Sequence, residues 1–510
     1  MTRLKPPARK IPPAVADQAK LKKTSSVNSQ NNNNNNHTRQ GKLQMVLILV
    51  MAVCMGMTLY VNVTSTSASN MDMIQYSAAF HQAIEDFRQG AMSRKSTTTT
   101  SNQQQQSSKQ QPVLGDSLIA KLSCEPHGGP ADEFAQEMIY WEDIPSDALW
   151  VSPFRQKRGE HRRYMTFEPD GGGWNNIRMA METVVGLAAA MGRTLVLPPQ
   201  KQMYLLGKGD NKQKRHFGFE DFFPMQQMAM ENAAIDMITM KEFLELEAMT
   251  GNLKDKATGR TSFPPYNRTD WNGLSGMEYD ELREWLRTVT LVPQWNPEKC
   301  LAAFPANGDH SSVQELIDMQ QTIHKEGIKI ESYIGNPVPV DGPPIDRMKE
   351  NLNNRRDLCV YDEAMEKEMV VHFACAHKLG LRLLVHFYEF LYLEDWKEDL
   401  WMKRFMRDHM RYNDDIQCAA ARLVHMMRQL ARKNGNPTGE FDSFHIRRGD
   451  FQYKNTRIPA EEILTNIRQY LTPNTTIFIA TMKGTSPSLN QCESTTIYTS
   501  WMTLRICCRE

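Results

Sequence analysis

The sequence of 510 residues lacks the features that most directly identify a binding site. Its charge is balanced, with 60 Lys and Arg against 59 Asp and Glu, which argues against a nucleic-acid-binding surface. It contains neither the dinucleotide fingerprint Gly-x-Gly-x-x-Gly nor a phosphate-binding loop that ends in Gly-Lys-Ser/Thr. It also contains no Cys-x-x-Cys pair and no Asp-x-Asp motif, so we expect neither a metal ion nor a cofactor.

The balanced net charge conceals an uneven distribution along the chain. The segment before residue 43 carries nine Lys or Arg against the single acid Asp17, and residues 43–63 carry no charge. Residues 45–63 are apolar enough to cross a bilayer as one helix, and the positive-inside rule then places residues 1–44 in the cytosol. We therefore expect a single-pass type II membrane protein. A cleaved signal peptide is the alternative, since Ser67-Ala-Ser69 resembles a cleavage site.

Composition also divides the remainder of the chain. Residues 64–125 are rich in Ser, Thr and Gln, so they predict a disordered stem without a core. We place an amino-terminal domain at 126–380, a second domain at 381–482 and an atypical tail at 483–510.

The segment from Phe441 to Asp450 holds the strongest candidate binding residues. A strand-like approach delivers His445, Arg447 and Asp450 to a glycine turn. The planar guanidinium fork matches phosphate oxygens, and a carboxylate can orient a guanidinium or accept a hydrogen bond from a sugar hydroxyl. The alternative is a structural salt bridge at the end of a strand.

The residues that follow this turn predict a βαβ unit. Proline, early acids and apolar spacing indicate a helix over 458–467, and residues 476–480 predict a buried strand. Ligands of such units bind at the carboxyl ends of the strands, where residues 445–450 would lie.

A second unit of this kind lies upstream. Residues 163–167 predict a strand, 170–176 a glycine-rich loop, 177–191 a helix that Gly192 closes, and 194–198 the returning strand. The chain therefore predicts an α/β fold with two polar loops at strand ends.

On these motifs, over about residues 160–482, the chain resembles the GDP-fucose protein O-fucosyltransferases, in particular their plant- and algal-type branch. The resemblance is strongest from Arg382 to Tyr388, from Lys403 to Tyr412 and from Phe444 to Lys454. The loop from Pro169 to Arg178 is similar to the family's Pro-Glu-Gly-Phe-Asn-x-Arg loop, although it has an extra glycine and Asp in place of Glu.

The resemblance implies a set of site residues. The first arginine of the family's His-x-Arg motif contacts the donor diphosphate, which implies this role for Arg447, with His445 and Asp450 in the same donor site. In the other loop it implies Asp170 as the catalytic base and Asn176 facing the sugar, with the donor-binding glycines Gly172 and Gly173 between them.

The resemblance further implies a GT-B-like architecture, in which two Rossmann-like domains face a cleft. The reaction would be inverting transfer of fucose from GDP-fucose to a Ser or Thr hydroxyl of a protein, in the Golgi or endoplasmic reticulum membrane. No convincing fold period follows Lys483, so we expect the second domain to be incomplete, the strand at 476–481 to lack neighbours and activity to be low. An inactive binding or scaffold protein, or a transferase for another GDP-sugar, are the alternatives.

Several further residues carry weaker signals. Five cysteines of the body predict one or two disulfides of undetermined pairing. His372, Cys375 and His377 resemble metal ligands but are better explained as a buried helix face, and Arg404, Arg407, His409 and Arg411 either help to hold GDP or face solvent. Asn267-Arg-Thr269 fits a glycosylation site on an exposed loop.

Overall fold

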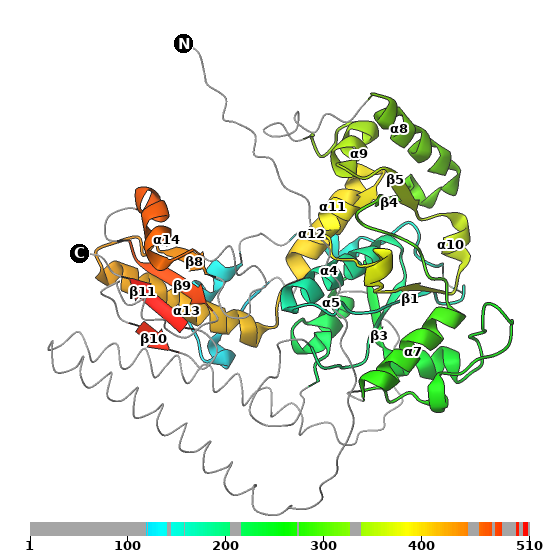
Figure 1. Ribbon diagram of the computed structural model, residues 1–510, viewed down its shortest axis with the longest axis horizontal. Coiled ribbons are helices and arrows are strands. Elements are labelled where there is room, and N and C mark those ends of the chain that lie inside the picture. The colour runs from blue at the N-terminus through cyan, green and yellow to red at the C-terminus, as the bar shows by residue number, and fades with distance from the viewer. Residues whose placement is uncertain are drawn as a thin grey trace, which may run out of the picture. The chain divides into compact units, whose positions relative to one another are not determined.

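The computed structural model describes residues 119, 121–139, 144–157, 159–203, 216–272, 275–326, 338–446, 458–471, 475–481, 496–498 and 503–507. These residues contain three β-sheets (Figure 1). Among them, no helix combines the length and the apolarity that a membrane span needs. The expected transmembrane helix at 45–63 and residues 64–118 of the predicted stem at 64–125 lie outside the described residues. Ile119, Leu122 and Cys124, which the sequence places in that stem without a core, are buried.

The first sheet has the strand order β3-β2-β1-β6, and all four strands are parallel. Its strands are β1 (Tyr164–Phe167), β2 (Thr194–Leu197), β3 (Asp236–Thr239) and β6 (Val370–Phe373). Helix α4 (Trp174–Ala190) connects β1 to β2. The predicted upstream βαβ unit is thus confirmed, with the polar loop between β1 and α4 at the carboxyl edge of the sheet.

Both faces of this sheet are covered, as a parallel sheet requires. Because side chains alternate along a strand, Met165 packs against α4 on one face while Tyr164 packs on the other face. The second face is covered by α6 (Met240–Phe243) and α7 (Gly276–Val289). Every residue of β1 is buried, which explains why its sequence shows no alternation of apolar and charged residues.

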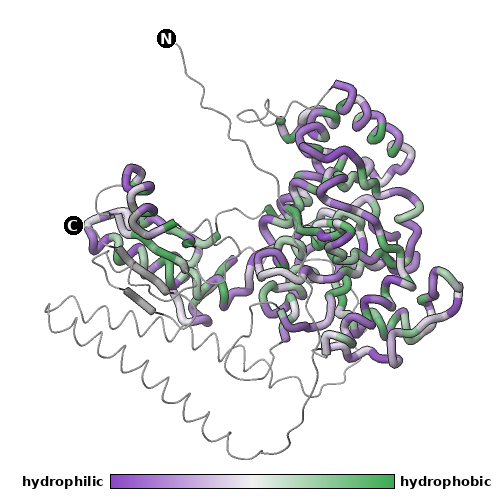
Figure 2. The backbone as a smooth tube through the Cα atoms, in the orientation of Figure 1, coloured by the Kyte–Doolittle hydropathy of each residue, from purple (hydrophilic) through white to green (hydrophobic). Residues whose placement is uncertain are grey.

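The second sheet has three parallel strands in the order β5-β4-β7. They are β4 (Cys300–Phe304), β5 (Asp357–Val360) and β7 (Leu391–Leu393). Its outer face packs against α8 (Val313–Glu326) and α9 (Pro344–Leu352). Hydrophilic and hydrophobic stretches alternate along α8, as expected for a helix with one face on the core (Figure 2).

The region from residue 381 to 433 contains three helices and a strand. Helices α11 (Phe387–Phe390), α12 (Trp396–His409) and α13 (Asp414–Lys433) are present, but β7 lies between α11 and α12. A run of three residues is too short to show the two-residue period that separates a strand from a helix. The pairing of β7 with β4 joins residues on both sides of residue 380, and the domain boundaries stay predictions.

The third sheet contains the second predicted βαβ unit. Strand β8 (Asp442–His445), helix α14 (Ala460–Ile467) and strand β9 (Ile477–Thr481) follow one another, and β8 and β9 pair in parallel. The last two strands, β10 (Thr496–Tyr498) and β11 (Thr503–Cys507), extend the sheet to the order β10-β11-β9-β8.

The expectation that the strand at 476–481 lacks neighbours is therefore wrong. Strand β9 lies between β8 and β11, and β11 pairs with all five residues of β9 in antiparallel orientation. The segment after Lys483 is rich in Ser, Thr and Cys, and its two short strands are separated by only a few residues, so its sequence showed no recognisable period. The remaining α-helices of the described residues are α3 (Asp132–Ala135), α5 (Met225–Glu231) and α10 (Glu363–Lys367).

Candidate active site

A cluster of charged side chains lies at the carboxyl edge of the first sheet. Glu168 and Asp170 follow β1, Cys375 follows β6, and Lys201 follows β2 after three intervening residues. These strands are neighbours in the sheet, so their loops meet at the same edge. This is the edge at which open parallel α/β sheets bind their ligands.

Asp170 is held from both sides by the loop and by an arginine. Its side chain is 1% exposed, and its Oδ1 accepts a hydrogen bond of 2.7 Å from the backbone N–H of Gly172. Arg382 engages both carboxylate oxygens, Nη2 with Oδ1 at 2.8 Å and Nε with Oδ2. The same ion pair raises the pKa of Arg382. Arg382 is 27% exposed, so the pair joins the buried loop to the surface.

The loop packs closely around this pair at position 172, where any side chain would displace its neighbours. A Cβ added there would lie 2.5 Å from Nδ2 of Asn176, 2.8 Å from Oδ1 of Asp170 and 2.9 Å from Nη2 of Arg382. A Cβ added at Gly173 would meet no heavy atom within 4 Å. The structure therefore brings together Asp170, Gly172, Gly173 and Asn176, the four candidate residues of this loop.

Glu168 is a second buried carboxylate that the sequence analysis did not single out. Its oxygens accept hydrogen bonds from Arg287 at 2.8 and 2.9 Å, from His372 at 3.1 Å and from the backbone N–H of Cys375 at 3.0 Å. Burial alone would raise the pKa of Glu168, but the hydrogen bonds from His372 and Arg287, together with the charge of Arg283, lower it to about 2. Glu168 is therefore ionised at neutral pH and fully engaged.

His372 supports Glu168 as a neutral imidazole. Burial lowers the pKa of His372, although the carboxylate of Glu168 opposes this shift. Its Nδ1 lies 2.8 Å from Oγ1 of Thr166, so the neutral ring accepts from this hydroxyl and donates from Nε2 to Glu168. The sequence placed His372 on a helix, but it lies in β6. Among the described residues, no group of His, Cys, Asp and Glu side chains has the arrangement of a metal site.

Lys201 brings a cation to the same cluster. Its Nζ donates to the carbonyl of Pro169 at 3.2 Å and lies 5.6 Å from the ring centroid of Tyr279. Burial, and then the charge of Arg283, lowers the pKa of Lys201. Burial, and then the charges of Asp170 and Glu168, raises the pKa of the Cys375 thiol, which disfavours the thiolate.

The second predicted site is described in part. His445 ends β8, is exposed and pairs in register with Ala480 of β9. His445 thus lies at the carboxyl end of a parallel strand, as the sequence predicts. Arg447 and Asp450 lie outside the described residues, so their predicted contacts with a donor stay predictions.

Two arginines of the basic run on and just after α12 are paired within the protein. Arg404 pairs with the buried Asp147 at 2.6 Å. Arg411 is buried and donates to the carbonyls of Ile119 at 2.6 Å and Lys121 at 2.9 Å. These arginines attach the amino-terminal segment to α12, a role that no local sequence pattern reports.

Four of the five body cysteines form disulfides, in agreement with the expected one or two bonds. Cys124 pairs with Cys418, and Cys300 pairs with Cys359. Cys375 is free. Asn267 ends a short 3-10 turn with a positive φ of 54° and is exposed, as expected for a loop that could carry a glycan.

Comparisons with known proteins give one match. A family model described as GDP-fucose protein O-fucosyltransferase matches residues 164–500, which covers the described strands from β1 to β10. No curated protein and no solved structure matches the chain. The family match extends beyond residue 482, into the segment that the sequence analysis separated as a tail.

Proposed function

Because the chain belongs to the GDP-fucose protein O-fucosyltransferase family, we propose that it transfers fucose from GDP-fucose to a Ser or Thr hydroxyl of a protein acceptor, with inversion. The family implies a glycosyltransferase with a nucleotide-sugar donor and an acceptor substrate. The parallel α/β sheets are consistent with a Rossmann-like glycosyltransferase fold. We further propose the two-domain GT-B arrangement that the resemblance implies.

The observation that carries this proposal is the charged cluster at the carboxyl edge of the first sheet. There the glycine loop, Asp170 and Arg382 form one hydrogen-bonded unit beside the start of α4. A glycine loop with a partly exposed arginine beside it at this edge suits a ligand with negative oxygens. A nucleoside diphosphate sugar is such a ligand.

The proposed reaction has simple chemical requirements. The acceptor oxygen bonds to the anomeric carbon of fucose while the bond from that carbon to the diphosphate breaks, and the electron pair leaves with GDP. Arg447 would stabilise the negative charge that develops on the diphosphate, with His445 and Asp450 lining the same donor site. The hydroxyl proton passes either to Asp170 or to a phosphate oxygen of the departing GDP. No step requires a metal ion, and we propose that the reaction is metal-independent.

We also propose that the chain acts on the luminal side of the Golgi or endoplasmic reticulum, anchored by residues 45–63. Two disulfides support an oxidising compartment, since such bonds are rare in the cytosol. Protease protection of microsomes tests this topology, with the glycan on Asn267 as a second readout through the Asn267→Gln variant. Digestion of the region after residue 63 from the cytosolic side would contradict it.

Turnover of GDP-fucose by the full chain tests the function. Arg447→Ala should remove transfer and weaken GDP binding, because loss of a charge-assisted contact in a closed site costs about 3 kcal/mol. Arg447→Lys should restore little, since an ammonium lacks the planar fork. Turnover that survives in EDTA supports metal independence. GDP binding without any transfer would instead support a binding or scaffold protein, and normal turnover by Arg447→Ala would refute the assignment of the arginine.

A further inference from the structure

The ion pair between Asp170 and Arg382 has a geometry that distinguishes it from a simple structural contact. The carboxylate of Asp170 is 1% exposed, whereas the guanidinium of Arg382 reaches the surface with 27% of its side chain exposed. Asp170 engages Nε and Nη2 of Arg382. Nη1 has no hydrogen-bond partner among the described residues. It lies on the side of the guanidinium opposite to the edge, formed by Nε and Nη2, that contacts the carboxylate.

The surrounding loop fixes this orientation. The backbone N–H of Gly172 donates to the same Oδ1 that Nη2 of Arg382 contacts, so loop and arginine share one acceptor. The carboxylate is thereby held as an anion, because both its oxygens accept hydrogen bonds from donors of positive or partly positive charge. Such a carboxylate is a weak general base.

From this geometry we propose that Arg382 contacts the diphosphate of the nucleotide sugar through Nη1, and that Asp170 acts as a positioning residue for Arg382. This inference rests on the proposed function. It assigns the proton of the acceptor hydroxyl to a phosphate oxygen of the departing GDP, which gains the electron pair of the broken bond and is the stronger base in the site. Arg382 would then stabilise the negative charge on the leaving group.

The position of the pair favours a ligand of this kind. Gly171 and Gly173 flank Gly172, and a Cβ added at either would meet no heavy atom within 4 Å. Open space therefore lies on the outer side of the loop, where a ligand could approach its backbone. Lys201, in the segment that follows the neighbouring strand β2, adds a further positive charge. Its Nζ donates to the carbonyl of Pro169 in this loop.

Titration calorimetry with GDP, together with GDP-fucose turnover, tests the proposal on the full chain. Arg382→Gln should weaken GDP binding about 10- to 100-fold, the effect expected for a lost charge-assisted hydrogen bond. Asp170→Asn should weaken it to a similar degree, and the variant with both changes should bind no more weakly than Arg382→Gln alone. Arg382→Lys keeps the charge and should recover part of the affinity, which the loss of a merely structural pair would not do.

Arg162→Gln is the matched control. Arg162 pairs with Asp236 at 2.7 Å, is 32% exposed and lies at the opposite edge of the same sheet, so its loss should leave GDP affinity unchanged. Thermal unfolding of each variant separates loss of binding from loss of fold. If Asp170→Asn or Arg382→Gln unfolds, Asp170→Glu and Arg382→Lys decide the matter, since both should bind GDP more weakly than the unchanged protein.

The outcomes separate this inference from the proposed function. If Asp170→Asn binds GDP normally but loses turnover and the acidic limb of its pH profile, Asp170 is the base and the inference is wrong. Normal GDP affinity of Arg382→Gln in a chain that turns over GDP-fucose also overturns it, while the function stands. A full chain that neither binds GDP nor uses GDP-fucose overturns both.

Discussion

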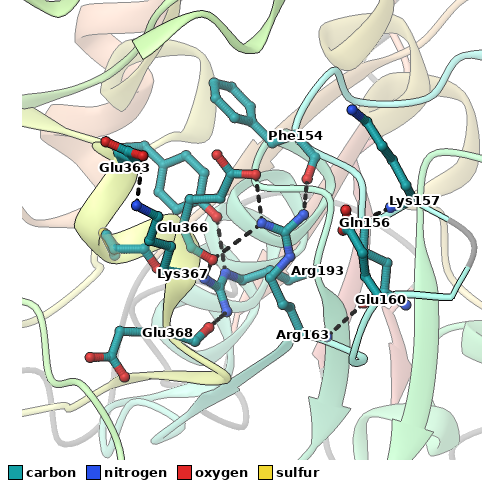
Figure 3. A network of polar contacts seen from close by, with 12 residues as sticks. Phe154, Gln156, Lys157, Glu160, Arg163, Arg193, Glu363, Glu366, Lys367 and Glu368 are labelled. Atoms are coloured by element: carbon teal, nitrogen blue, oxygen red, sulfur yellow. Dashed lines mark hydrogen bonds and ion pairs between the residues drawn. The ribbon is translucent and has the colours of Figure 1, made fainter.

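Arginine-rich clusters lie at both edges of the first sheet, but the arginines differ in burial and in partners. At the amino edge, Arg193 is 1% exposed, and its guanidinium donates to the hydroxyl of Tyr361 and to four backbone carbonyls. Figure 3 shows Arg193 beside Arg163, which donates to Glu366 and to the carbonyl of Phe154. At the carboxyl edge, Arg382 contacts the carboxylate of Asp170 and Arg287 contacts that of Glu168.

Arg193 and Arg382 differ in whether the guanidinium still has a donor that faces solvent. The partners of Arg193 are all neutral oxygens at the ends of chain segments, so its five contacts fix the start of β1, β2 and β6. Burial lowers its pKa, although Tyr361 opposes the shift. Arg382 has a carboxylate on one side and solvent on the other. The contacts of Arg193 are therefore complete within the protein, whereas Arg382 keeps one side of its guanidinium toward solvent.

The largest effect on stability should come from Arg193→Met. The change removes the donors to four carbonyls and to a buried hydroxyl, and unsatisfied groups of this kind each cost about 1 to 3 kcal/mol. We expect a loss of about 3 kcal/mol or more in the free energy of unfolding, measured by urea denaturation. Arg162→Met at the same edge is the control, and a wild-type midpoint for Arg193→Met would show that this edge does not depend on it.

Glu168→Gln should have a comparable effect that depends on pH. The pKa of Glu168 is about 2 in the folded protein and is near 4.5 in an unfolded chain, so its ionised form contributes about 3 kcal/mol above pH 4.5. That contribution is lost as the pH falls from 4.5 toward 2. We expect the variant to be less stable than the wild type at pH 7, with the difference shrinking in acid. Parallel unfolding curves at all pH values would contradict the role of Glu168.

His372 should make the stability of the folded protein depend on pH in a higher range than Glu168 does. Its pKa is lowered from 6.5, so the neutral form is preferred in the folded state and protonation below pH 6.5 favours unfolding. In His372→Gln, which keeps a donor for Glu168, we expect the decrease in stability between pH 6.5 and 5 to be smaller than in the wild type. Urea midpoints at these two pH values measure it, and an unchanged decrease would show that other groups control this range.

The smallest effect on stability should follow from substitution of Gly172. The atoms that a Cβ would meet are the ends of flexible side chains, so Gly172→Ala should cost only about 1 kcal/mol while it displaces Asp170 and Arg382. GDP affinity should fall more than stability does. Gly171→Ala is the control, because its Cβ has open space and the change should be neutral or slightly stabilising. If Gly172→Ala and Gly171→Ala bind GDP with equal affinity, the ion pair between Asp170 and Arg382 does not contribute to GDP binding.

Local patterns of the sequence predicted β1, α4 and β2 because a buried strand, a glycine loop and an apolar helix face each leave a signal within about 20 residues. The same is true of α14 and β9. The pairing of Asp170 with Arg382 joins residues 212 positions apart, and that of Glu168 with Arg287 joins residues 119 positions apart. No local period reports such contacts. Glu168 did carry one signal, since a carboxylate directly after a buried strand lies at the binding edge.

The bond between Cys124 and Cys418 has a consequence for biosynthesis. Its two residues are separated by 294 positions, so under the proposed luminal location the first thiol meets oxidising conditions long before its partner has been synthesised. At about 5 to 20 residues per second, translation alone imposes a delay of about 15 to 60 s. During this interval Cys300 and Cys359 become available to each other and to Cys124. The order of the cysteines therefore requires Cys124 to stay unpaired until Cys418 has been synthesised.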